Sequence, residues 1–202
     1  MAALKLPRDF YERDEVVEIA RELLGKVLVT QINGVITAGK IVETEAYSGQ
    51  TDKASHAFFA GKTERTKIMY GPGGYAYVYL CYGIHHLFNI VTNGEEKADA
   101  VLIRGIEPLF GVDEILKRRN KTILERSVGG GPGIASQALG ITTHHYGADL
   151  CGNCIWLEDQ GFQISSNNIV ASPRVGVHYA GEDAQLPWRF RILGNGFTSP
   201  AK

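Results

Sequence analysis

The feature that most constrains the fold of this chain is an Asn-Gly pair at positions 33 and 34. The pair stands between two runs rich in apolar and β-branched residues, 26–32 and 35–47. Asn-Gly readily adopts the left-handed conformations of a tight turn, whose twist matches that of the flanking strands. The sequence therefore predicts an antiparallel β-hairpin whose second strand ends at Tyr47.

Further periodic segments surround this hairpin. Helical spacing predicts a packing helix over residues 9–24, and short helices around 112–118 and from 134 to just before Gly140. Residues 48–66 are polar and are predicted to form a long loop, and 71–74 a turn. Strand patterns occur at 75–82, 86–92, 100–106, 154–158 and 188–193. Gly83 permits a reversal between the first two, which predicts a projecting hairpin.

One domain accounts for all of these elements. The 202 residues are 44% hydrophobic and contain no repeat, low-complexity tract or separating linker. We predict a single compact α+β domain over residues 1–202. A curved, mostly antiparallel sheet with the projecting hairpin would carry the site, and helices would cover its other face.

Composition also bears on location and partners. Neither a secretory segment nor a membrane span is recognisable, and three cysteines are too few for a disulfide framework, so we expect a cytoplasmic protein without a membrane partner. The 21 basic and 22 acidic residues give a net charge of −1, which argues mildly against DNA. A basic face on a neutral body remains open.

Two carboxylates share one face of the second hairpin strand. Side chains two residues apart on a strand point the same way, so Glu43, Glu45 and Tyr47 line one surface. Such a face is commonly just solvated, but the apolar residues before it indicate a partly buried strand. Buried carboxylates are rare without a partner or a task.

This strand and the segments after it resemble the alkyladenine (3-methyladenine) DNA glycosylase family, in its bacterial form. The resemblance covers about residues 5 to 195, with every motif in the family order. The matching segments are residues 41–47 (IVETEAY), His56, 77–83 (YVYLCYG), 88–90 (FNI), 101–104 (VLIR), 107–108 (EP), 131–132 (GP), 174–176 (RVG) and 188–190 (WRF).

The resemblance implies a DNA repair enzyme that flips a damaged purine out of duplex DNA and hydrolyses its N-glycosidic bond. Glu45 would be the base that activates water, and Arg104 would help to position that water. The flipped base would stack among Tyr47, His56 and Tyr79. Asn89 would exclude the exocyclic amine of normal guanine, and Tyr82 at the hairpin tip would fill the vacated stack.

No lysine matches a nucleophile position, so direct hydrolysis to an abasic site is expected, as in this monofunctional family. Alkylated or deaminated purines are the expected substrates: 3-methyladenine, 7-methylguanine, hypoxanthine and etheno-adenine. The sequence does not rank them. The protein is expected to act as a monomer on double-stranded DNA, in association with the nucleoid in a bacterium.

Candidate phosphate contacts are less specific. They comprise Lys117, Arg118, Arg119 and Lys121 in a basic cluster, and Gly131 and Gly133 in the turn before a helix. A solvated helix end and a plain turn explain the same residues equally well.

Cofactor signals are weak. The Gly-Pro-Gly-Gly run at 71–74 precedes a strand rather than a helix, which disagrees with a dinucleotide site. Cys151 and Cys154 form one C-x-x-C near His144 and His145, whereas structural zinc sites usually use two spaced pairs. We predict no cofactor and no metal.

Two other functions fit part of the sequence. An O-glycoside hydrolase could use Glu43 and Glu45 as its carboxylate pair, although neighbours on one strand face lie side by side rather than across a sugar. A non-catalytic module could recognise bent DNA with the Tyr82 hairpin alone. Replacement of Glu45 by Gln distinguishes all three.

Overall fold

The computed structural model describes residues 4–200, and residues 1–3 and 201–202 of the predicted domain lie outside the described part. The strands are β1 (Leu4–Lys5), β2 (Val27–Ile32), β3 (Val35–Tyr47), β4 (Ala76–Cys81), β5 (His85–Thr92), β6 (Asp99–Phe110), β7 (Ile155–Asp159), β8 (Ile169–Ser172) and β9 (Arg189–Ile192). The helices are α1 (Arg8–Tyr11), α2 (Val16–Glu22), α3 (His56–Ala60), α4 (Val112–Arg119), α5 (Arg126–Gly129) and α6 (Pro132–Leu139), with short 3-10 segments at Lys67–Tyr70, Thr143–His145, Ser166–Asn168 and His178–Gln185.

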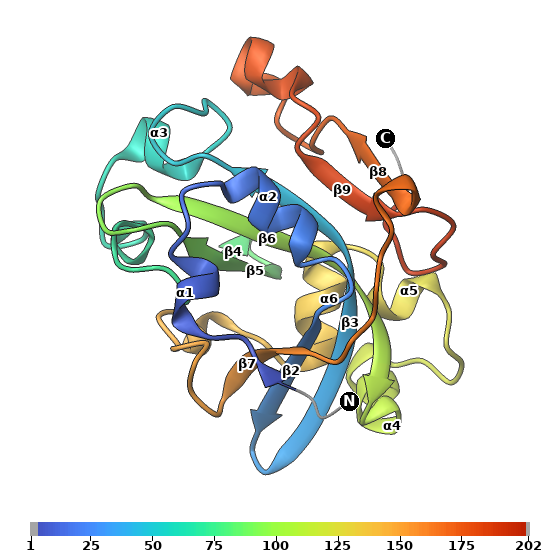
Figure 1. Cartoon of the computed structure of the whole chain (residues 1–202). Helices are drawn as coiled ribbons and strands as arrows, with labels where there is room; N and C mark the ends of the chain where they lie inside the picture. The colour runs from blue at the N-terminus through green and yellow to red at the C-terminus, as the bar shows by residue number, and fades with distance from the viewer. Residues whose placement is uncertain (1–3, 201–202) are drawn as a thin grey trace.

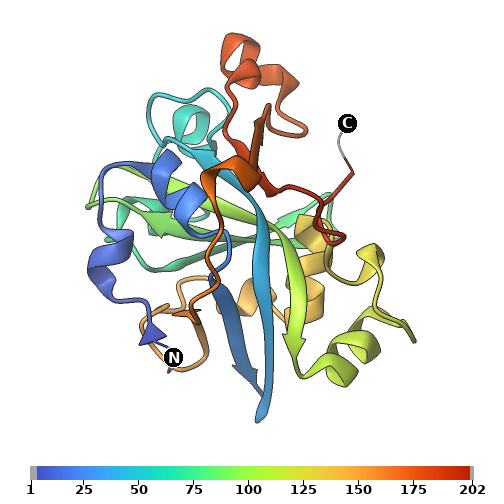
Figure 2. The ribbon, with the colours of Figure 1, turned by 45° about the vertical axis from the view of Figure 1, so that its right-hand side comes forward.

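All strands belong to one antiparallel sheet (Figure 1). Its main path runs β1-β7-β2-β3-β6-β5-β4, and β9 adds to the β3 strand beyond the part that pairs with β2. Helices and this sheet in a single unit confirm the predicted α+β class. The long β3 strand joins the two parts of the sheet, as the turned view in Figure 2 shows.

The β2–β3 hairpin forms as the Asn-Gly pair predicts. Asn33 and Gly34 both have positive φ, 51° and 79°, and Ile32 pairs with Val35 across the turn. The pairing of β3 with β6 shifts register next to Gly39 and on both sides of Glu43. Such bulges bend a strand, so they account for the curvature of the sheet at the point where the carboxylates begin.

The projecting hairpin is also confirmed. The β4 and β5 strands pair from Ala76 with Ile90 to Cys81 with His85. Tyr82 and Gly83, with φ of 51° and 73°, form the reversal. The hairpin therefore ends on a turn that presents Tyr82 at its tip.

The single helix predicted over residues 9–24 is wrong, because the structure divides it into α1 and α2. The Tyr11 carbonyl accepts a hydrogen bond of 2.7 Å from the Asn93 N–H instead of continuing a helix. The Tyr11 ring is fully buried in the core. A contact distant in sequence thus ends α1, which local periodicity cannot reveal.

Other segments also differ from the sequence expectation, among them β1 and α5, which were not predicted. The predicted loop over residues 48–66 contains the short helix α3, capped by the Ser55 side chain, which accepts from the Ala57 N–H at 3.3 Å. The β8 strand has no predicted counterpart and pairs with β9.

Helices contact both faces of the sheet. The Thr44 hydroxyl donates to the Ala20 carbonyl of α2 at 2.8 Å, so α2 lies on the face opposite Glu45. Helix α6 begins beside the Arg104 backbone, because the Gly131 N–H donates to the Arg104 carbonyl at 2.8 Å. The α6 helix therefore lies next to the predicted site rather than behind it. None of the helices within residues 4–200 has the length and apolar character needed to cross a membrane.

Candidate active site

Glu45 is closed off from solvent and held by three donors. Its Oε1 accepts a hydrogen bond of 2.8 Å from the Val175 main-chain N–H. Its Oε2 accepts one of 2.8 Å from the Tyr47 hydroxyl and lies 3.2 Å from Nη1 of Arg104. Hydrogen bonds to a charged group are stronger than neutral ones, so these donors fix the orientation of the carboxylate.

Glu43 lies beside Glu45 but is saturated by protein groups. Its Oε1 lies 2.9 Å from Nε of Arg104 and 2.8 Å from Nε of Arg189. The Ser199 hydroxyl donates to Oε1 at 2.7 Å and its N–H to Oε2 at 2.5 Å. Although burial favours the neutral acid, the Arg104 charge and the Ser199 hydrogen bonds hold the pKa of Glu43 below its usual value. Glu43 therefore stabilises the two arginines as a buried anion.

The ion-paired side chains of Glu43, Glu45, Arg104 and Arg189 form a charged floor. A cavity of about 550 Å³ opens above this floor, and Arg104 lines it. Its size lies within the range of small-ligand pockets. Four of its lining residues are the predicted base contacts and a fifth is the predicted hairpin wedge: Tyr47, His56, Tyr79, Asn89 and Tyr82. Arg104 and Val175, both bonded to Glu45, also line it. The structure thus brings together the predicted catalytic pair and every predicted base contact, although they span residues 45 to 104.

His56 and two tyrosines make the aromatic wall. Nδ1 of His56 lies 2.8 Å from the Tyr77 hydroxyl, and its ring centroid is 4.7 Å from that of Tyr79. Burial, assisted by the Arg65 charge, lowers the pKa of His56 to about 4. The imidazole is therefore neutral at pH 7. Because α3 begins at His56, its main-chain N–H belongs to the helix start, where N–H groups lack a partner within the helix.

Tyr47 is supported from its other side by Arg174. The guanidinium carbon lies 4.7 Å from the Tyr47 ring centroid and 5.1 Å from that of Trp188. Arg174 is ion-paired with buried Asp52 and donates to the Ala46 carbonyl at 2.9 Å. This contact fixes the plane of an aromatic ring whose hydroxyl also holds Glu45.

Arg174 and Val175 had no assigned role in the sequence analysis. The contact of Arg174 with Ala46 and that of Val175 with Glu45 join residues 128 and 130 positions apart, which no local pattern predicts. The signal that could have revealed them is the Arg-Val-Gly motif at 174–176, one of the segments that carry the family resemblance.

Asn89 and Tyr82 lie at opposite extremes of exposure. Asn89 is buried on β5, and its Nδ2 donates to the carbonyl of Tyr77 at 3.1 Å. Tyr82 is 92% exposed at the hairpin tip. The first is a fixed part of the cavity wall, and the second projects from it.

The four cations among the predicted phosphate contacts all have protein partners, but they differ in exposure. Arg118 donates to the Thr37 hydroxyl at 3.1 Å and pairs with Glu114, and Arg119 donates to the Ser127 carbonyl at 3.0 Å. Both arginines therefore connect α4 to the rest of the protein. Lys117 is 82% exposed and its Nζ lies 3.8 Å from Oε2 of Glu114, and Lys121 pairs with Glu125 at 2.9 Å.

Gly131 and Gly133 lie where α6 begins. Pro132 between them lines the cavity, and a Cβ on Gly133 would meet the His85 side chain at 2.9 Å. The start of α6 thus lies against the projecting hairpin, and Gly133 permits that close approach.

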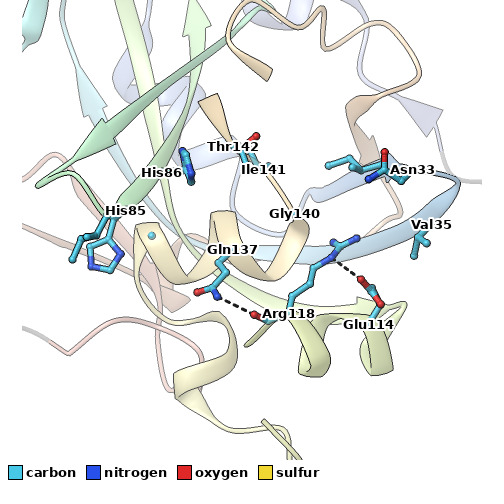
Figure 3. A pocket seen from close by; sticks show the side chains of 13 residues that line it. Asn33, Val35, His85, His86, Glu114, Arg118, Gln137, Gly140, Ile141 and Thr142 are labelled. Carbon is cyan, nitrogen blue, oxygen red and sulfur yellow. Dashed lines mark hydrogen bonds and ion pairs between the residues drawn. The ribbon is translucent and has the colours of Figure 1, made fainter. Parts of the chain in front are cut away.

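A second cavity, of about 580 Å³, lies between the hairpin, the β2–β3 turn and α6 (Figure 3). Arg118 points toward Glu114 in this view, and Gln137 donates to the Arg118 carbonyl at 2.9 Å. The second cavity shares no lining residue with the first cavity. It therefore contains neither Glu45 nor any predicted base contact.

Cys151 and Cys154 are free thiols. Within residues 4–200, no cluster of three or more His, Cys, Asp or Glu side chains has the geometry to hold a metal ion.

An aromatic cavity lies over a buried carboxylate, beside a hairpin tipped by an exposed tyrosine, and its rings can stack against a planar ligand such as a nucleobase. Comparison with known proteins identifies the family. Residues 9–196 match the family described as methylpurine-DNA glycosylase (MPG). The chain therefore belongs to the methylpurine-DNA glycosylase family, and it is a DNA glycosylase of the 3-methyladenine type.

Curated relatives agree over the whole chain. Proteins of Alkaliphilus oremlandii and Clostridium perfringens strain 13 are 43% and 44% identical, over 97% of this chain and 99% of their own lengths. A protein of Bacillus cereus strain AH820 is 41% identical with the same coverage. Each is named "Putative 3-methyladenine DNA glycosylase". The chain is thus a hydrolase of DNA repair that acts on N-glycosyl bonds.

Proposed function

We propose that this protein removes alkylated and deaminated purines from double-stranded DNA and leaves an abasic site. The substrates would include 3-methyladenine, 7-methylguanine, hypoxanthine and etheno-adenine. The observation that carries the proposal is the position of Glu45, sealed from bulk water yet bonded to two groups that line the base-sized cavity, Tyr47 and Arg104.

Extrusion of the base comes first. Unpairing and unstacking a nucleotide costs a few kcal/mol, and less for a damaged one. Tyr82 is free to enter the stack from the hairpin tip because its side chain has little contact with the protein. The tyrosine would occupy the gap and hold the DNA bent.

The extruded purine would then stack among Tyr47, His56 and Tyr79. Aromatic faces attract cations, so these rings favour the electron-poor bases that alkylation produces. The His56 N–H at the start of α3 can donate to the purine edge. Asn89, fixed by its bond to the Tyr77 carbonyl, would crowd the exocyclic amine of normal guanine.

Hydrolysis would follow beneath the stacked base. A water oxygen attacks C1′ of the sugar while the N-glycosidic bond breaks, and the bonding electron pair leaves with the base. Glu45 accepts a proton from that water and stabilises the positive charge on the sugar. Arg104, whose Nη1 lies 3.2 Å from Oε2 of Glu45, would help to position that water.

The reaction would stop at the abasic site. A strand-cutting glycosylase forms a covalent bond from an amine nucleophile. No lysine is among the residues that line the cavity within the described part of the chain.

Contacts to the DNA backbone would come from main-chain N–H groups at the start of α6, near Gly133, and from exposed Lys117, which has only a 3.8 Å contact with Glu114 to lose. The Gly131 N–H already donates to the Arg104 carbonyl, so Gly131 would shape the turn rather than bind phosphate. Arg118, Arg119 and Lys121 would have to give up protein partners to bind phosphate. We expect weak non-specific affinity, a monomeric enzyme and action in the cytoplasm at the nucleoid.

The two alternatives fit the geometry less well. An O-glycoside hydrolase needs a second available carboxylate, but Glu43 is occupied by Arg104, Arg189 and Ser199. A module that only binds bent DNA has no use for a closed carboxylate below its hairpin.

The test uses duplexes that each carry one defined lesion. The purified protein, without added metal, should release the damaged base, and alkali should then cut the DNA at that position. Borohydride should trap no covalent protein–DNA complex. Intact duplexes after incubation with all four lesions would contradict the proposed function, and a trapped complex would contradict direct hydrolysis.

A further inference from the structure

Arg65 belongs to the cavity but has no role in the steps above. It lies on the segment between α3 and the 3-10 helix Lys67–Tyr70. The Thr66 hydroxyl fixes this segment, because it accepts from the Thr63 N–H at 2.9 Å and donates to the Gly61 carbonyl at 2.5 Å. The Arg65 guanidinium carbon lies 4.9 Å from the Tyr79 ring centroid, and Arg65 lines the cavity.

The charge balance of the cavity makes Arg65 unusual. The floor contains two glutamates, Glu43 and Glu45, and two arginines, Arg104 and Arg189, in ion-pair contact. Its formal charges therefore cancel. Within residues 4–200, Arg65 forms no ion pair. Among the residues that line the cavity, Arg65 thus supplies the uncompensated positive charge.

A positive charge on this wall opposes one class of substrate. A cationic purine and a guanidinium are both attracted to the face of an aromatic ring. The Arg65 guanidinium already contacts the Tyr79 ring, and like charges a few Å apart repel even where solvent screens them. A neutral purine meets no such repulsion, and its ring nitrogen atoms or an exocyclic carbonyl oxygen can accept from the guanidinium.

We propose that Arg65 is a specificity-determining residue that shifts this enzyme from cationic lesions toward neutral ones. The inference rests on the proposed function and specifies the substrate class of the same cavity. The neutral state of His56 agrees with it, since the Arg65 charge, after burial, lowers the pKa of that imidazole. The cavity wall thus presents one cation rather than two.

The test compares two lesions in the same duplex sequence, cationic 7-methylguanine and neutral hypoxanthine. The readout is the ratio of their kcat/KM values, in which differences in protein concentration cancel. The Arg65→Gln variant should raise the ratio of 7-methylguanine to hypoxanthine by about three- to tenfold, as expected for removal of one partly screened charge. Arg65→Lys keeps the charge and should keep the parent ratio.

Arg13→Gln is the matched control, because Arg13 also lies 4.9 Å from an aromatic centroid, that of Phe10, and is remote from the cavity. It should leave the ratio unchanged. An unchanged ratio in Arg65→Gln, or an equal loss for both lesions as from a phosphate contact, would overturn the assignment while leaving the proposed function intact. If the parent releases neither base, the proposed function fails, and the assignment of Arg65 fails with it.

Discussion

The floor of the cavity and the tip of the β4–β5 hairpin differ most in how firmly their functional side chains are held. On the floor, Glu43 and Glu45 have no solvent exposure, and each accepts from at least three donor groups. At the tip, Tyr82 is 92% exposed. Both regions belong to one sheet, yet the carboxylates of the floor are held by charged and polar partners, whereas the Tyr82 side chain is exposed to solvent.

This difference corresponds to two kinds of work. Fixed charges and dipoles stabilise a developing charge at little cost in reorganisation, so a group that activates water benefits from many partners. A side chain that enters a base stack must exchange protein contacts for DNA contacts, so it benefits from having few to lose. We therefore expect changes on the floor to affect folding and chemistry together, and changes at the tip to affect DNA binding alone.

Replacement of Arg104 by Met should give the largest change in stability. It leaves Glu45 buried without its cation and removes one of two cations from Glu43. Breaking a buried ion pair on one side typically costs about 3–5 kcal/mol. Urea denaturation should show a loss of this size in the free energy of unfolding, together with loss of base release. A change below about 1 kcal/mol would mean that the floor is not held by charge.

The pH dependence of stability tests how far burial extends up the cavity wall. The pKa of His56 is about 4 in the folded protein, below its ordinary value near 6.5 in an unfolded chain. Between pH 6.5 and 4, His56 therefore binds a proton in the unfolded chain but not in the folded protein. The stabilisation is complete above pH 6.5 and is lost as the pH falls toward 4.

At pH 5 this loss amounts to roughly 2 kcal/mol relative to pH 7.5. Denaturation of the parent and of His56→Gln at both pH values isolates it, because the variant lacks the titrating group. Equal losses in the free energy of unfolding of the two proteins would show that His56 titrates normally. The aromatic wall of the cavity would then be as open to solvent as the hairpin tip.

Replacement of Tyr82 by Ala should change stability least. Replacement of an exposed side chain that has few protein contacts usually changes the free energy of unfolding by no more than about 0.5 kcal/mol, so the urea midpoint should stay in place. Affinity for a lesion duplex should fall by about tenfold, since one stacking contact is worth about 1–3 kcal/mol. Tyr82→Phe, which keeps the ring, serves as the control. A destabilised Tyr82→Ala protein with normal DNA affinity would reverse the comparison.

The two regions were predictable from the sequence for local reasons. The alternation of side chains along a strand places Glu43, Glu45 and Tyr47 on one face, and glycine after Tyr82 marks a reversal. Both signals depend on neighbours in the chain. The structure agrees with each of them.

The remaining features depend on contacts distant in sequence. The Arg174 guanidinium behind Tyr47, the Val175 N–H on Glu45 and the Ser199 hydroxyl on Glu43 all come from the last 30 residues of the chain. Similarly, the break after α1 depends on Asn93. Tertiary packing decides such contacts, and periodicity carries no information about them.

The most direct measurement of the central claim is single-turnover base release by the parent and by Glu45→Gln, with excess enzyme and one lesion duplex. General-base catalysis contributes about 10²- to 10⁴-fold, and the amide cannot accept the proton from water. We predict a loss of base release in that range, with the equilibrium affinity for the lesion duplex within about threefold of the parent. Base release by Glu45→Gln at the parent rate would contradict the role of this buried carboxylate.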